Sequence, residues 1–226
     1  MPGQLVFPFG VEPALGREDF IPAPCNEQAV QFIRRWPNWP HPAAALHGPS
    51  GCGKTHLAAV WRELAGAQLV PAGELAMGAA AVSGEAPTAW LIEDLDRREP
   101  DAAGDRILLG LFERPSAALL LTGRGAPSEW PAAIGDLRSR FQALIGFAMW
   151  APDDALLSAL VTKHFSDRQL EAPAAVVRRI ITHVERTPEA IARFVARADQ
   201  KALSEKRAIT DRLILELIEL EERPGS

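Results

Sequence analysis

Short apolar runs alternate with longer segments through the first two thirds of the chain, and this alternation predicts the fold class. The runs suit buried strands, and the segments between them are long enough to form helices. Strands that are separated by helices usually lie parallel in one sheet, so the pattern indicates an α/β domain. The predicted strands are residues 43–47, 68–70, 89–93, 118–122 and 143–148, and a predicted helix over 26–35 precedes them.

Beyond residue 150 proline and glycine become scarcer, and apolar residues recur at helical spacing. Two predicted apolar faces are formed by Val176, Val177, Ile180, Ile181 and Val184, and by Ile191, Phe194, Val195 and Ala198. Thr187 before Pro188 suits a helix start, and Thr210 can begin a last helix. The sequence therefore predicts three parts: an extended arm over 1–15, an α/β domain over 16–150 and a small all-helical domain over 151–226.

Composition narrows the class of protein. With 226 residues, 47% apolar and 23% charged, the chain is typical of a soluble globular protein. The formal charge of −5 excludes a dedicated nucleic-acid coat, so any DNA contact would be local. Two cysteines, Cys25 and Cys52, are too few for a structural zinc site and suit a reducing compartment. Because neither a secretory signal nor a membrane span is evident, we expect a cytoplasmic protein that does not bind membranes.

The segment 48–55 fits the phosphate-binding pattern G-x-x-x-x-G-K-[ST] at every fixed position, between a predicted strand and a predicted helix. Its residues are Gly48, Pro49, Ser50, Gly51, Cys52, Gly53, Lys54 and Thr55. Glycines let the loop turn N–H groups toward phosphate oxygens at the positive end of a helix. Lys54 would reach the β- and γ-phosphates, and the Thr55 hydroxyl would bind Mg²⁺. The segment predicts nucleotide binding; the alternative is a glycine-rich turn that matches by chance.

A phosphate-binding loop needs an acidic partner on a neighbouring strand, and the run 90–92 ends in Glu93 and Asp94. One carboxylate would hold the magnesium ion through water, and the other would orient the attacking water. Asp96 is a less favoured alternative for either role. Thr122 ends the fourth predicted strand, where it could touch the γ-phosphate or that water. Arg140 precedes the last strand. Without the other motifs, an arginine in an exposed loop is more often a solvated charge than a functional residue.

These motifs together resemble the AAA+ ATPases and, within them, the DnaA-like proteins, over roughly residues 16–220. The residues that carry the resemblance are Asp19-Phe20-Ile21 with Asn26, then Gly48 to His56, Leu120-Leu121-Thr122 and Ser139-Arg140-Phe141. The resemblance implies a parallel sheet of strand order 5-1-4-3-2 followed by a helical lid. It also implies that ADP or ATP binds with Mg²⁺ held by Thr55 and Glu93, with the adenine near Phe20, Ile21 and Pro24. No DNA-reading helix-turn-helix domain follows the lid, so sequence-specific DNA binding is not expected.

The arm is similar to the clamp-binding peptide Q-L-x-L-P-[LF] of the Hda family of DnaA regulators, in the run Gln4-Leu5-Val6-Phe7-Pro8-Phe9. Leu5, Phe7 and Phe9 can enter apolar pockets while Gln4 makes a polar anchor. The alternative is an arm that packs on its own domain. The resemblance implies that the protein binds the sliding clamp and DnaA, and that Arg140 reaches the nucleotide of DnaA. The sequence leaves monomer and homodimer open.

The chain departs from the DnaA pattern at three places. Glu93 and Asp94 stand where DnaA has two aspartates, and Arg124 replaces an acidic residue. The lid arginine of DnaA falls on Pro188, with Arg186 and Arg193 as candidates to replace it. These departures predict a regulator that holds nucleotide and hydrolyses it weakly.

Two other functions remain open at the level of the sequence. A helicase-loader-like ATPase would hydrolyse its own ATP, bind single-stranded DNA and contact the helicase, but it has no use for the run 4–9. A nucleotide-binding scaffold would oligomerise without catalysis, because AAA+ modules host many functions. In the lid, Arg193, Arg197 and Lys201 form a basic stripe for which a solvated surface is favoured over a DNA contact.

Overall fold

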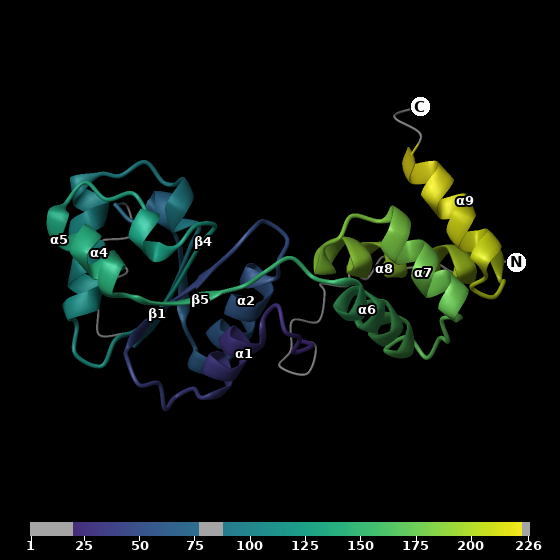
Figure 1. The fold of residues 1–226 in the computed structure, drawn as a ribbon, viewed down its shortest axis with the longest axis horizontal. Helices are drawn as coiled ribbons and strands as arrows, with labels where there is room; N and C mark the ends of the chain where they lie inside the picture. Colours follow the sequence, from purple (N-terminus) through teal and green to yellow (C-terminus); the bar gives the residue numbers. More distant parts are fainter. Residues whose placement is uncertain (1–19, 77–87, 223–226) are drawn as a thin grey trace, which may run out of the picture.

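A computed structural model describes residues 20–76 and 88–222 and shows an α/β half beside a helical half (Figure 1). Five parallel strands form one sheet in the order β2-β3-β4-β1-β5. The strands are β1 (Ala43–His47), β2 (Gln68–Pro71), β3 (Ala89–Glu93), β4 (Ala118–Gly123) and β5 (Ile145–Ala148). The predicted parallel sheet and its strand order are confirmed.

Helices cover both faces of this sheet, which explains why the central strands are apolar throughout. On one face lie α1 (Glu27–Arg34) and α2 (Lys54–Ala65), and on the other lie α4 (Ala102–Glu113) and α5 (Gly135–Ala143). Successive side chains of β4 alternate between the two cores: Leu120 packs with the first pair of helices, and Leu119 and Leu121 pack with the second.

The last predicted strand begins too early. Residue 143 completes α5, and β5 starts at Ile145. The apolar run 143–148 spans a helix end and a strand, and periodicity cannot separate them within six residues. Arg140 consequently lies on a helix, where the sequence had suggested a loop.

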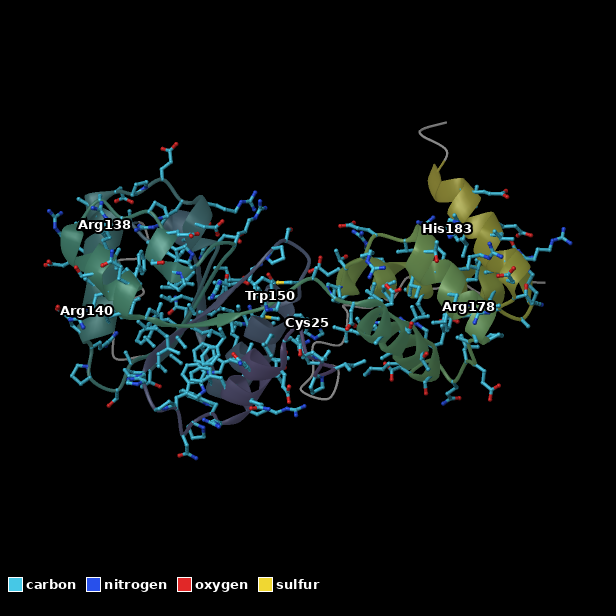
Figure 2. All side chains as sticks on the ribbon, in the orientation of Figure 1. Cys25, Arg138, Arg140, Trp150, Arg178 and His183 are labelled. Atoms are coloured by element: carbon cyan, nitrogen blue, oxygen red, sulfur yellow. The ribbon has the colours of Figure 1, made fainter. Side chains whose placement is uncertain are left out.

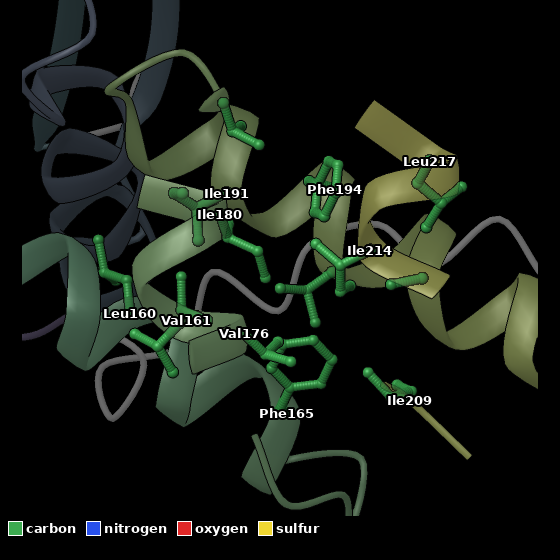
Figure 3. Close-up of a cluster of buried hydrophobic side chains, with 14 of the residues drawn as sticks. Leu160, Val161, Phe165, Val176, Ile180, Ile191, Phe194, Ile209, Ile214 and Leu217 are labelled. Atoms are coloured by element: carbon green, nitrogen blue, oxygen red, sulfur yellow. The ribbon is translucent and has the colours of Figure 1, made fainter. Parts of the chain in front are cut away.

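The helical half is built from α6 (Asp154–Ser166), α7 (Ala174–His183), α8 (Pro188–Glu205) and α9 (Asp211–Glu222) around one apolar core (Figure 3). Side-chain caps fix the starts of three helices: Asp153 accepts from the Leu156 amide (2.8 Å), Thr187 from Ala190 (3.1 Å) and Thr210 from Leu213 (3.3 Å). The helix starts predicted at Thr187 and Thr210 are confirmed. The division into domains at residue 150 stays a prediction.

None of the helices within residues 20–76 and 88–222 is both long and apolar enough to cross a membrane. The arm 1–15, with its proposed clamp peptide, lies outside the described residues.

Candidate nucleotide-binding site

The loop 48–55 leaves the end of β1 and enters α2, as the sequence predicts. Gly51 and Gly53 have φ angles of +75° and +95°, in the left-handed region that favours glycine. A Cβ added to Gly48 would lie 1.9 Å from the carbonyl oxygen of Met149, so only glycine fits there. Because α2 begins at Lys54, the loop surrounds a helix N-terminus, where free N–H groups and the helix dipole favour an anion.

Lys54 lies almost buried inside this loop, with 9% of its surface exposed. Its Nζ donates to the carbonyl oxygens of Gly48 (2.8 Å) and Pro49 (2.9 Å) and lies 3.8 Å from Cys52 Sγ. The loop therefore keeps one positive charge at its centre. A phosphate that enters the loop would meet both the helix N-terminus and this ammonium group.

Glu93, at the end of β3, lies beside Thr55 in the first turn of α2. Burial raises the pKa of the Glu93 carboxyl, the hydrogen bond with the Thr55 side chain lowers it, and nearby Asp94 raises it again. The Oε1 atom of Glu93 is buried and has no hydrogen-bond partner. A divalent cation would give this oxygen a partner and favour the charged carboxylate.

Thr55 and Glu93 therefore fit Mg²⁺. Across residues 20–76 and 88–222, no three His, Cys, Asp or Glu side chains gather into a metal-binding group. Mg²⁺ does not need such a group, because it is usually held by one or two protein ligands, substrate phosphates and water. The two residues can supply the protein's share of such a site.

Asp94 follows in the left-handed conformation, with φ +59°. Its backbone N–H donates to Thr122 Oγ1 at 3.2 Å, so the ends of β3 and β4 bring these two predicted site residues together. The Asp94 carboxylate, however, is more than half exposed and lies 3.6 Å from Arg97 Nη1. Asp96 has a buried Oδ1 without a hydrogen-bond partner, so it stays an alternative acid at this edge.

The residues predicted to bind adenine lie in the segment 20–26, which contacts the loop through Phe20. The Phe20 ring packs edge-on against His56, with 5.3 Å between ring centroids, and a Cβ added to Gly53 would lie 3.7 Å from it. Ile21 packs against the core of the helical half, and Pro24 is exposed. The buried Asn26 orders this segment by accepting from the Ala23 amide (2.9 Å) and donating to the Ile21 carbonyl (3.2 Å).

The helical half touches the loop directly, which the sequence did not predict. A Cβ added to Gly51 would lie 2.3 Å from the Thr187 γ-methyl group, so the N-terminus of α8 rests on the loop. The capping signal located Thr187 but gave no indication of this contact. Arg186, one candidate for the missing lid arginine, pairs with Asp154 (2.6 Å) and donates to the Pro152 carbonyl (3.4 Å).

This contact leads to a prediction for Gly51→Ala. The new Cβ would push Thr187 and the start of α8 away from the loop, and alanine is strained at a positive φ. We expect ADP binding, measured by calorimetry, to weaken about tenfold. A second change, Thr187→Ser, removes the clashing methyl but keeps the capping hydroxyl, so the double variant should regain part of the affinity. If Gly51→Ala bound ADP as tightly as the unaltered protein, the contact between Gly51 and Thr187 would have no role in nucleotide binding.

Arg140 lies far from this loop. Its Nη2 is 4.0 Å from Glu113 Oε1, and 52% of the Arg140 side chain is exposed. Figure 2 shows Arg140 at the opposite end of the α/β half from Trp150. Trp150 follows Met149, whose backbone packs against Gly48, so it marks the position of the loop. Among the described residues, the structure thus brings Thr55 beside Glu93 and Asp94 beside Thr122 at one edge of the sheet, and it leaves Arg140 outside this group.

Together these features define the fold class of the protein. The glycine-rich loop 48–55 after β1, the acidic end of β3, the strand order β2-β3-β4-β1-β5 and the C-terminal helical bundle make up the AAA+ fold.

Solved structures confirm the fold. Domain III of DnaA from Thermotoga maritima matches with a TM-score of 0.76 at 15% identity, over 94% of this chain and 98% of that one. AMPPCP-bound DnaA from Aquifex aeolicus gives 0.71 at 16% identity, over 86% and 68% of the two chains. RuvB from Thermotoga maritima gives 0.69 at 18% identity, over 91% and 72%. No protein-family model and no curated sequence matches the chain. At these identities the likeness shows the fold alone.

Proposed function

We propose that this protein is an adenine-nucleotide-binding regulator of DnaA, similar to the Hda family. It is held by the sliding clamp through Gln4, Leu5, Phe7 and Phe9, and it promotes hydrolysis of DnaA-bound ATP through Arg140. The observation that carries the proposal is the position of Arg140, exposed on α5 and remote from the chain's own phosphate-binding loop.

An arginine in this position is better placed to contact the nucleotide of a neighbouring molecule than the nucleotide of its own chain. Arg140 is about half exposed, and its partner Glu113 is 67% exposed, so their ion pair is weak and exchanges easily for a phosphate. A guanidinium group placed on the γ-phosphate of another molecule stabilises the charge of the transition state. The similarity of this chain to DnaA domain III in fold makes DnaA a fitting neighbour, because like modules can pack side by side.

The chain's own site suits nucleotide holding. The loop 48–55 would bind the phosphates of ADP or ATP, with Lys54 on the phosphates and Thr55 and Glu93 on Mg²⁺, which would neutralise phosphate charge there. Glu93, with its longer side chain, stands where DnaA has an aspartate, and it is the carboxylate that contacts Thr55. This arrangement favours slow hydrolysis and long occupancy, as a regulator requires.

The proposal is tested by measuring hydrolysis of DnaA-bound ATP with the clamp loaded on DNA, in the presence and absence of this protein. Acceleration of that hydrolysis supports the proposal, and unchanged turnover contradicts it. The effect of removing Arg140 is argued in the Discussion.

Clamp binding gives a second, independent test. We expect the variant Gln4→Ala, Phe7→Ala, Phe9→Ala to bind the purified sliding clamp at least about 30-fold more weakly than the intact chain, because buried anchors carry most of the energy of such contacts. Surface plasmon resonance measures the difference. Val6→Ala, at the variable position of the peptide, is the control and should bind normally. Failure of the intact chain to bind would favour the helicase-loader hypothesis.

A further inference from the structure

A buried ion pair lies between the acidic end of β3 and the helix that carries Arg140. Arg98 follows the short 3₁₀ helix η2 (Leu95–Arg97), five residues beyond Glu93, and Asp105 lies in the first turn of α4. Their side chains are 1% and 0% exposed. Such complete burial of two charges is unusual and requires a physical reason.

The Asp105 carboxylate is the centre of a network. One of its oxygens accepts from Arg98 Nη2, and the other accepts from the backbone amides of Ala133 (2.7 Å) and Ile134 (2.8 Å). Arg98 Nη2 also donates to the Pro131 carbonyl at 3.0 Å. Ile134 is the residue immediately before α5. A single carboxylate thus ties the start of α5 to α4 and to the segment that follows β3.

The network is a poor source of stability. Arg98 Nε and Nη1 are buried and lack hydrogen-bond partners, so part of the desolvation cost of the guanidinium group is not recovered. Apolar side chains of similar volume would fill the same space at lower cost. What apolar side chains could not do is hold the segment 131–134 by directed hydrogen bonds. The pair therefore serves to fix the position of the segment 131–134, and not to stabilise the fold.

A second connection reaches α5 near Arg140 from the same edge of the sheet. Trp130 packs on the end of β4, where a Cβ added to Gly123 would lie 2.6 Å from its Nε1, and it contacts Phe141 at 5.4 Å between rings. Phe141 is the neighbour of Arg140. The helix is thus held at its start by Arg98 and Asp105 and near its end by Trp130. The first connection begins five residues after Glu93, and the second begins at Gly123, the residue after Thr122.

We propose that Arg98 and Asp105 are positioning residues for the reaction of Arg140: they fix α5 so that the guanidinium group meets the partner's phosphate in a productive geometry. This inference rests on the proposed function. Their side chains are almost fully buried, away from the protein surface. They act through the start of α5, and their loss would displace Arg140 by a small distance without removing it.

The experiment replaces the pair by apolar side chains, Arg98→Met with Asp105→Leu. A matched control, Arg179→Met with Asp211→Leu, removes a bidentate pair (2.7 and 3.0 Å) from the helical half. Each protein is titrated into DnaA–ATP with clamp-loaded DNA, which gives a plateau rate of hydrolysis and a half-saturating concentration. Partial unfolding would raise the half-saturating concentration and leave the plateau unchanged. Misplacement of Arg140 would lower the plateau instead.

We expect the Arg98, Asp105 variant to lower the plateau about 10²-fold, as a displacement of about 1 Å can, with the half-saturating concentration within threefold of that of the unaltered protein. The control should match the unaltered protein in both quantities. An unchanged plateau, or a change in the half-saturating concentration alone, overturns the inference. If the double variant does not fold, Asp105→Asn keeps an acceptor for the two amides but removes the charge that orients Arg98, and its plateau should also fall.

Failure of the proposed function can be told apart from failure of this inference. If neither the unaltered protein nor Arg140→Ala changes DnaA-bound ATP turnover, the proposed function is wrong. Hydrogen exchange of the amides of residues 135–143 then decides the positioning role without a partner. Faster exchange in the Arg98, Asp105 variant, with the α8 amides unchanged, supports that role, and equal exchange overturns it.

Discussion

Replacing Arg140 with alanine should reduce the stimulated hydrolysis of DnaA-bound ATP by at least about 10³-fold, because an arginine supplied in trans is typically worth about 10³ to 10⁵ in rate. The loss arises in the transition state, where the guanidinium group would neutralise developing phosphate charge. Single-turnover assays with radiolabelled ATP on DnaA measure it directly. Binding of the chain's own nucleotide should not change, since Arg140 lies far from the loop 48–55.

Two neighbouring variants sharpen this test. Arg138→Ala removes the same charge from the same helix; Arg138 is exposed and donates to the Ala132 carbonyl at 3.0 Å. It should retain most of the stimulation. Arg140→Lys keeps the charge but loses the planar fork that matches a phosphate, so an intermediate rate is expected. Full activity of Arg140→Ala would leave the proposed role without support.

Replacing Lys54 with alanine should weaken ADP binding roughly 100-fold or more. Removal of one partner of a buried, hydrogen-bonded charge pair commonly costs about 3 kcal/mol. The substitution removes two interactions of the ammonium group. One is its contact with phosphate, and the other is its pair of hydrogen bonds to the carbonyls of Gly48 and Pro49, which hold the loop in shape. Isothermal titration with ADP and Mg²⁺ gives the affinity.

Lys201→Ala is the control for this change. Lys201 pairs with Glu205 at 2.7 Å on α8, so its loss removes a lysine and an ion pair without touching the loop. Its ADP affinity should equal that of the unaltered protein. Tight ADP binding by Lys54→Ala would show that the loop 48–55 is not a nucleotide site.

The sequence predicted the elements whose signals are local. The β1 strand and the loop 48–55 combine a buried apolar run with fixed glycines, and Thr187 before Pro188 starts α8 as expected. The end of α5 could not be separated from β5, because residues 143–148 are uniformly apolar apart from Gly146 and suit both elements.

Contacts between residues far apart in the sequence could not be predicted, because the sequence signals are local. Nothing in the spacing of Gly51 and Thr187 indicates that they touch, since they belong to different halves of the chain. Arg98 and Asp105 each look like ordinary surface charges in the sequence, and only folding buries them together. The Asp94 side chain lies 3.6 Å from that of Arg97, and nothing in the sequence indicated that these two charges meet.

The separation of Arg140 from the loop 48–55 gives the protein a polarity. An interface that joins the arginine of one molecule to the nucleotide of the next is heterologous, and repeated contacts of this kind form a directional row. Such a row has two unlike ends, one presenting a free arginine and the other a free nucleotide site. In the proposed function, this protein would join such a row at the end that presents a free nucleotide site, where its Arg140 would meet that nucleotide.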